Sequence, residues 1–138
     1  FDEHAAFFQE LYRVAWKRLD PLMTEIRKYL INAFEIPTQL VRSSDLDPIS
    51  TKSGLVLELC RKVGATTYIS GPFGRDYLDY LAFGEAGIDI IFHDYQHPEY
   101  KQTFSSFEPY MSAIDLLLNH GAQSRRILEN SSKVLNTS

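Results

Sequence analysis

Residues 66–92 read TTYISGPFGRDYLDYLAFGEAGIDIIF, and this stretch decides the fold class. It opens with a β-branched and aromatic run, 66–69, and closes with the nearly all-apolar run 88–92, as in strands covered on both faces. Between these runs, residues 75–86 carry apolar side chains at helical spacing. A strand, a helix and a second strand joined by short connections favour a parallel crossover.

The same pattern extends upstream. Residues 51–63 have the periodicity of an amphipathic helix that ends before Gly64, and residues 39–42 form a short β-like run. Together with the two later runs they predict a small parallel β-α-β-α-β sheet flanked by helices. The chain is therefore predicted to be α/β.

Helices are expected at both ends of the chain. Residues 5–18, and a second helix started by Asp20 and Pro21, predict an N-terminal helical pair. After a long aromatic-rich loop, 93–110, Ser112 is placed to cap a further helix. A last short helix over 123–129 precedes a polar tail that we expect to be frayed.

Chain length, net charge and cysteine content restrict the class of protein. A chain of 138 residues is the size of one domain, and its net charge of −4, with no basic run, argues against nucleic acid as a partner. No apolar stretch reaches the length of about 18 residues that a membrane span needs. The single cysteine, Cys60, excludes an internal disulfide and favours the cytoplasm.

Three polar clusters follow the predicted strands: 43–45, 70–75 and 93–95. In a parallel sheet they would meet at the ligand-binding edge. The middle cluster suggests a phosphate site made by Ser70, Gly71 and Arg75 at a helix start. The alternative is that the glycines serve a tight turn and Arg75 pairs with Asp79.

Histidines and aromatic residues of the long loop are further candidates. His97, near Glu99, could act as a general base or metal ligand, although the spacing matches no zinc motif and solvated histidines are the alternative. No metal ligand is therefore assigned, and no cofactor is identified. The loop's tyrosines and phenylalanines could stack on a sugar or base, or could fasten the loop to the protein.

A polar stripe marks the helix that Ser112 caps. Ser112, Asp115 and Asn119 share one side of an otherwise apolar helix. Asp115 could complete a capping box with Ser112, or the stripe could line a site.

The downstream part of the chain resembles the C-terminal signature of the WbqC-like family, in the segments HPEYKQ, 97–102, and FEPYMSAIDLLLNHG, 107–121. Shorter matches upstream fall at 43–46, 64–71 and 77–78. The resemblance covers most of residues 36–128. The family's N-terminal Gln-Pro-x-Phe-x-Pro motif does not occur, so we expect residues 1–138 to be a single domain from the C-terminal part of such a protein.

The resemblance implies a role in bacterial surface polysaccharide (O-antigen) biosynthesis, as a transferase acting on a nucleotide-activated sugar. It implies that Tyr100, Gln102, Ser112, Asp115 and Asn119 line the site. Asp115 or His97 would then supply acid–base help. One alternative is a non-catalytic module whose loop and helical pair dock a partner or a second copy of the chain. A third is an inactive fragment.

Overall fold

The computed structural model describes residues 1–131 and 135–137 and divides the chain into two compact units. Unit 1 comprises Phe1–Thr38 and Gln96–Ser132, and unit 2 comprises Gln39–Tyr95 and Lys133–Ser138. Each unit has hydrophobic clusters of its own. Unit 1 is therefore discontinuous in sequence, with most of unit 2 inserted between its two segments.

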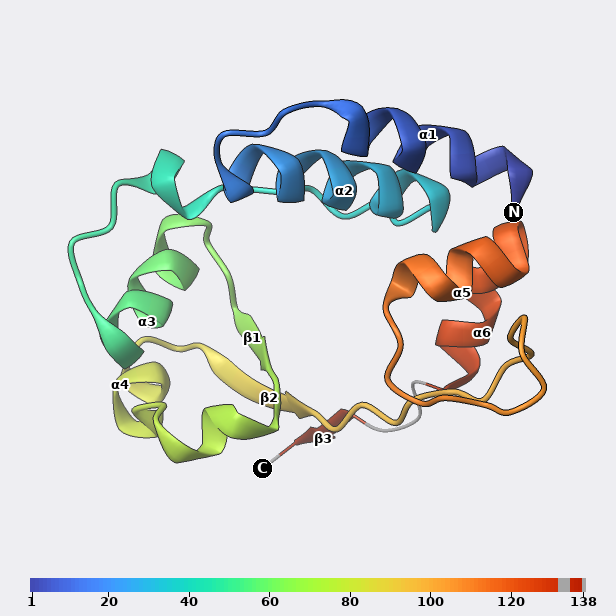
Figure 1. Cartoon of the computed structure of the whole chain (residues 1–138). Coiled ribbons are helices and arrows are strands. Elements are labelled where there is room, and N and C mark those ends of the chain that lie inside the picture. The colour runs from blue at the N-terminus through green and yellow to red at the C-terminus, as the bar shows by residue number, and fades with distance from the viewer. Residues whose placement is uncertain (132–134, 138) are drawn as a thin grey trace. The chain divides into compact units, whose positions relative to one another are not determined.

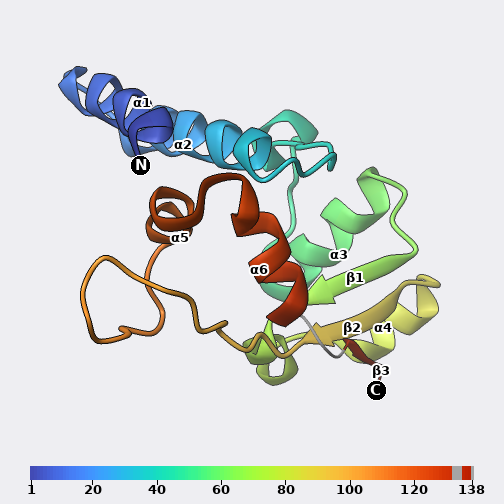
Figure 2. The ribbon, with the colours of Figure 1, turned by 90° about the vertical axis from the view of Figure 1, so that its right-hand side faces the viewer.

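The predicted N-terminal helical pair is confirmed. Helix α1 (Asp2–Arg13) and helix α2 (Leu19–Ala33) run side by side (Figure 1, Figure 2). Phe8 and Leu11 of α1 pack with Ile26 of α2 in a buried cluster, as expected for apolar residues spaced three and four apart.

The turn between α1 and α2 is fastened by Trp16, the single tryptophan of the chain. Its indole Nε1 donates a hydrogen bond to the carbonyl oxygen of Leu11 at 2.8 Å. The ring also packs against the cluster that joins the two helices. Trp16 is partly buried, and such a ring usually combines an apolar contact with a hydrogen bond from its N–H.

The C-terminal part of unit 1 is helical, with α5 (Ala113–His120), a 3-10 turn η3 (Gly121–Gln123) and α6 (Ser124–Ser131). The predicted start of α5 at Ser112 is confirmed, and so is its end at a glycine. Leu117 of α5 has no exposed surface and packs with Phe34 and Tyr100. Burying one leucine in this way contributes about 1.5–3 kcal/mol.

Unit 2 contains the sheet, and its elements are η1 (Ser43–Leu46), α3 (Lys52–Lys62), β1 (Thr67–Ser70), η2 (Pro72–Asp76), α4 (Tyr80–Glu85), β2 (Asp89–His93) and β3 (Leu135–Thr137). Strands β1 and β2 are parallel, with Tyr68 opposite Ile90. Strand β3 pairs with the other edge of β2 and is antiparallel to it. The prediction of an α/β fold with a parallel strand pair is confirmed.

Helices α3 and α4 pack on one face of this sheet. Cys60 of α3 and Phe83 of α4 share a buried cluster with Phe92 of β2, and Tyr68 of β1 packs against it. Side chains alternate along a strand, so Ile69 belongs to the opposite face, where it is 59% exposed.

Parts of the sequence prediction are wrong in unit 2. Residues 39–42 form no strand, so the β-α-β-α-β centre lacks its first strand. Leu40 and Val41 are about half exposed there, because a β-like run becomes a strand only when a partner strand accepts its hydrogen bonds. Of the tail expected to be frayed, residues 135–137 form β3, and residues 132–134 and 138 lie outside the described residues.

The predicted helix over 75–86 is divided into η2 and α4. Asp79 causes the break, since its side chain accepts a hydrogen bond from the Ala82 amide at 3.1 Å and so caps a new helix.

No helix within the described residues is both long enough and apolar enough to cross a membrane.

Candidate functional site

Asp115 is the centre of a polar network in unit 1. Its carboxylate Oδ2 accepts hydrogen bonds from the Tyr100 hydroxyl at 2.9 Å and from Gln102 Nε2 at 3.3 Å. Asn119 Nδ2 donates to Oδ1 at 3.2 Å and to the Asp115 carbonyl oxygen at 2.9 Å. The structure therefore brings together four of the residues that the sequence predicted for a site.

Helix α5 and the aromatic loop position these groups. Ser112 caps the helix, since its Oγ accepts a hydrogen bond from the Ile114 amide at 3.1 Å. Asn119 follows Asp115 by four residues and so lies beside it on the helix surface. Tyr100 is buried with the core leucines of α5, which brings its hydroxyl to the Asp115 carboxylate. Asp115 therefore makes side-chain contacts that a capping box with Ser112 would not require.

Gln102 closes the loop next to Asp115. Its side-chain amide pairs with the backbone of Glu108: Nε2 donates to the Glu108 carbonyl oxygen at 2.9 Å, and Oε1 accepts from the Glu108 amide at 2.8 Å. The Thr103 hydroxyl donates to Asn119 Oδ1 at 3.1 Å. Residues 103–107 therefore form a loop whose base is held by hydrogen bonds, which we call the clamped loop.

A pocket of about 290 Å³ lies between the clamped loop and α5. Its wall combines two carboxylates, an amide, two hydroxyls, an aromatic ring and a thioether. The residues are Gln102, Thr103, Phe104, Ser106, Glu108, Met111 and Asp115. Such a mixture offers several hydrogen-bonding groups beside apolar surface, as small-molecule sites do.

His97 lies in an aromatic cluster and does not line this pocket. Its ring centre is 5.8 Å from that of Tyr100, 5.9 Å from that of Phe107 and 5.4 Å from that of Tyr110. Buried rings such as that of Tyr100 fasten the loop to the core, whereas Phe104 is 83% exposed. The acid–base role of His97 stays a prediction.

In unit 2, the turn after β1 is set by the contact of Gly74 with Ser70. Ser70 is buried, and its hydroxyl donates to the Gly71 carbonyl oxygen at 3.0 Å. A Cβ at Gly74 would lie 2.0 Å from Ser70 Oγ, so only glycine fits there. A Cβ at Gly71 would meet nothing within 4 Å, so space does not require glycine at that position.

Arg75 does not stand at a helix start, nor does it pair with Asp79. It lies near the end of the short 3-10 helix η2 and makes a bidentate ion pair with Asp94. Its Nη1 donates to Oδ1 at 3.2 Å and its Nη2 donates to Oδ2 at 3.4 Å. Its guanidinium carbon lies 4.2 Å from the centre of the Phe92 ring. The prediction that a helix N-terminus helps Arg75 to hold phosphate is therefore wrong in its geometry. Phosphate binding by Ser70, Gly71 and Arg75 stays a prediction.

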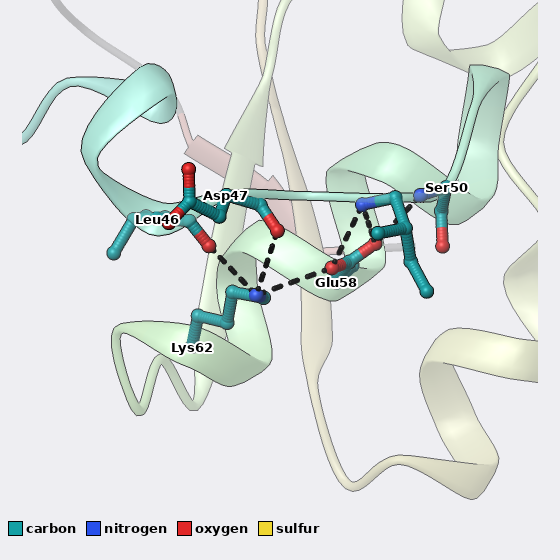
Figure 3. A network of polar contacts seen from close by, with 6 residues as sticks. Leu46, Asp47, Ser50, Glu58 and Lys62 are labelled. Carbon is teal, nitrogen blue, oxygen red and sulfur yellow. Dashed lines mark hydrogen bonds and ion pairs between the residues drawn. The ribbon is translucent and has the colours of Figure 1, made fainter.

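A second polar network in unit 2 fastens the segment before α3 (Figure 3). The Glu58 carboxylate accepts hydrogen bonds from the Ser50 amide at 2.8 Å and from the Ile49 amide at 3.2 Å. Lys62 Nζ donates to the Leu46 carbonyl oxygen at 2.7 Å and lies 3.4 Å from the Glu58 carboxylate. Hydrogen bonds from Ser50 foremost, then from Ile49 and Lys62, lower the pKa of Glu58 to about 2.

The buried thiol of Cys60 is poorly placed to act as a nucleophile. Cys60 is buried, and its burial raises the pKa of the thiol, which disfavours the reactive thiolate. In the part of the chain that the structure describes, no group of three or more His, Cys, Asp or Glu side chains is arranged to hold a metal ion.

Sequence reasoning missed four residues of the pocket wall, namely Thr103, Ser106, Glu108 and Met111, whereas Phe104 was among the loop aromatics predicted to stack on a sugar or base or to fasten the loop. These residues lie in an irregular loop, where no periodicity marks which side chains face inward. The Gln102–Glu108 pairing gathers them, and it joins a side chain to a backbone six residues away. No spacing rule identifies such a contact from sequence.

Comparison with known proteins places the chain in a family. The model of the WbqC-like protein family matches residues 1–127. The uncharacterized protein Rv1507c of Mycobacterium tuberculosis is 37% identical over 103 residues, which cover 71% of this chain and 45% of that protein. No solved structure matches. Since the family model spans nearly the whole chain, the chain belongs to the WbqC-like protein family.

Proposed function

We propose that this chain acts in the biosynthesis of bacterial surface polysaccharide, as part of a transferase that handles a nucleotide-activated sugar. The observation that supports the proposal most directly is the Asp115 carboxylate at the wall of the pocket, held by Tyr100, Gln102 and Asn119. A carboxylate fixed in this way can accept a hydrogen bond from a sugar hydroxyl or amine and take up its proton during transfer.

The pocket suits the sugar part of such a ligand better than its phosphates. Two of its lining residues, Glu108 and Asp115, are acidic, and none of the described residues that form its wall is basic. Carboxylates offer no favourable partner to a diphosphate, so the pocket wall itself does not bind one. Phosphate binding by Arg75 of unit 2 is a separate proposal. The free thiol of Cys60 fits a cytoplasmic site of action.

Ligand binding is tested by thermal unfolding of the chain with UDP-, GDP- and dTDP-linked sugars. A ligand that binds only the folded state, at a concentration of about 100 times its Kd, adds about 2.7 kcal/mol to the free energy of unfolding. We expect one of these sugars to raise the midpoint, and Asp115→Asn to abolish the shift. Asp2→Asn, at an exposed position on α1, is the matched control and should keep it.

The same titration tests Arg75. Arg75→Ala should weaken binding of the free nucleoside diphosphate, whereas Arg61→Ala, at an exposed position of α3, should not. Midpoints that stay fixed with every nucleotide sugar would contradict the proposed function.

A binding module without catalysis is the second candidate, and an apolar groove of unit 1 favours it. The groove has a volume of about 300 Å³ and is lined by Met23, Ile26, Arg27, Leu30, Ile31, Phe34, Ile36, Ala113 and Leu128. Met23 and Ile36 are each 41% exposed there. If a second copy docks on this groove, sedimentation will show a dimer that Met23→Glu dissociates, without any effect of nucleotide sugars.

A further inference from the structure

Phe104 occupies an unusual place for a large apolar side chain. It is 83% exposed, yet it lines the pocket beside Asp115. Exposed phenylalanines are common on protein surfaces when they stand alone. This one instead lies at a pocket wall that also carries carboxylates, hydroxyls and an amide.

The clamped loop holds Phe104 at that wall. Gln102 bonds both backbone groups of Glu108 on one side of the loop, and Thr103 is tied to Asn119 on α5. Phe107, at the other end, packs against Tyr100, with ring centres 5.7 Å apart. Both ends of the segment that carries Phe104 are fixed in the free protein. Binding a ligand therefore costs little of the conformational entropy that a mobile loop would lose.

The chemistry around Phe104 selects a ring with one apolar face and polar edges. Thr103 and Ser106 offer hydroxyls, and Glu108 and Asp115 offer carboxylates, which bond the hydroxyls of a sugar. Phe104 offers the flat apolar surface on which the C–H face of a sugar ring can stack. A pocket of about 290 Å³ is at the small end of ligand sites, which favours one sugar ring over a whole nucleotide sugar.

We infer that Phe104 is the stacking platform for the sugar ring held beside Asp115, and that it sets the preference for a sugar over other small polar ligands. This inference rests on the proposed function, because it names how the same pocket recognises its substrate. The nucleobase is the other flat ring of such a ligand, and the test distinguishes the two.

The test uses saturation-transfer NMR and calorimetric titration on the wild-type chain and on Phe104→Ala. With the nucleotide sugar that shifts the wild type, Phe104→Ala should raise Kd about tenfold, which corresponds to about 1.4 kcal/mol. The sugar ring protons should lose their transfer signal. Phe104→Trp should restore both, and the Kd for the free nucleoside diphosphate should not change.

Phe1→Ala is the matched control. Phe1 is 72% exposed and does not line the pocket, so its removal deletes the same side chain away from the site. Its Kd should equal that of the wild type. Both variants should keep the wild-type circular dichroism spectrum, because neither side chain is buried.

The outcomes separate the inference from the proposed function. If Phe104→Ala weakens the free nucleotide as much as the nucleotide sugar, the base stacks there and the inference is overturned. The inference also fails, with the proposed function intact, if Asp115→Asn abolishes binding and Phe104→Ala does not. Where no nucleotide sugar binds the wild type, methyl glycosides at millimolar concentration serve as the probe. Transfer signals that Phe104→Ala removes would then support the stacking role of Phe104 but not the proposed function. If the wild type gives no such signals, the inference and the proposed function are both overturned.

Discussion

Ser112 and Asp115 stand three residues apart at the start of α5, yet their side chains have different neighbours. The Ser112 hydroxyl accepts from a backbone amide of its own helix, whereas the Asp115 carboxylate accepts from Tyr100, Gln102 and Asn119. Only Asp115 lines the pocket. The contacts therefore assign Ser112 to the stability of the helix.

Replacing Ser112 with alanine tests that assignment. Ser112→Ala removes an N-cap, so we expect the free energy of unfolding to fall by about 1 kcal/mol, and Ser112→Asn should recover most of the loss. Urea denaturation measures both. Affinity for a nucleotide sugar should stay that of the wild type, and a loss of affinity beyond the loss of folded protein would contradict the assignment.

Some of the site could be predicted from single residues and some could not. Helical spacing placed Asp115 and Asn119 on one side of α5, and the family resemblance added Tyr100 and Gln102. The partner of Arg75 could not be predicted. Asp79, four residues away, was the natural candidate on a helix, but the structure pairs Arg75 with Asp94, which follows β2. That contact depends on the pairing of β1 with β2.

At the scale of elements, Glu58 and Lys62 connect α3 to the segment that precedes it. The folded-state pKa of Glu58 is about 2, below its ordinary value of 4.5. A lowered pKa means that the carboxylate stabilises the fold fully above about pH 4.5, and that this contribution disappears as the pH falls toward 2. The segment around Ser50 should therefore loosen from α3 in acid.

Glu58→Gln measures this contribution. Urea denaturation from pH 7 to pH 2.5 should show the wild type more stable than the variant above pH 4.5, with the difference shrinking as the pH falls. Glu25→Gln is the control, since Glu25 makes an exposed ion pair with Lys28 on α2. A Glu58→Gln difference that is constant with pH would rule out this role of the carboxylate.

The sequence predicted the elements that depend on local patterns and missed those that depend on distant partners. The helices were found because their periodicity is local, and α5 also carried a cap and a glycine end. The strand expected at 39–42 failed because strand formation needs a partner. Strand β3 was missed because Leu135–Thr137 is short and mostly polar. It forms through antiparallel pairing with β2, which its own sequence pattern does not predict.

At the scale of the whole molecule, the chain leaves unit 1 after Thr38, returns to it at Gln96, and then supplies β3 to unit 2. Arg125 of α6 donates through Nη1 to the carbonyl oxygen of Glu35, 90 residues earlier, at 2.6 Å. Unit 1 therefore needs both segments of its chain before its core closes. Contacts this distant in sequence slow folding, since a long loop must be ordered first.

Trp16 gives unit 1 an optical signature of its own. The only indole of the chain is bonded to Leu11 within unit 1, so tryptophan emission, excited selectively over that of the tyrosines, follows the melting of this unit and does not report on the sheet. Far-UV circular dichroism reports both units at once. If residues 1–138 behave as the single domain that the sequence predicts, the two melting curves will share one midpoint. Two midpoints would mean that each unit melts by itself, and the emission of Trp16 would identify which one melts first.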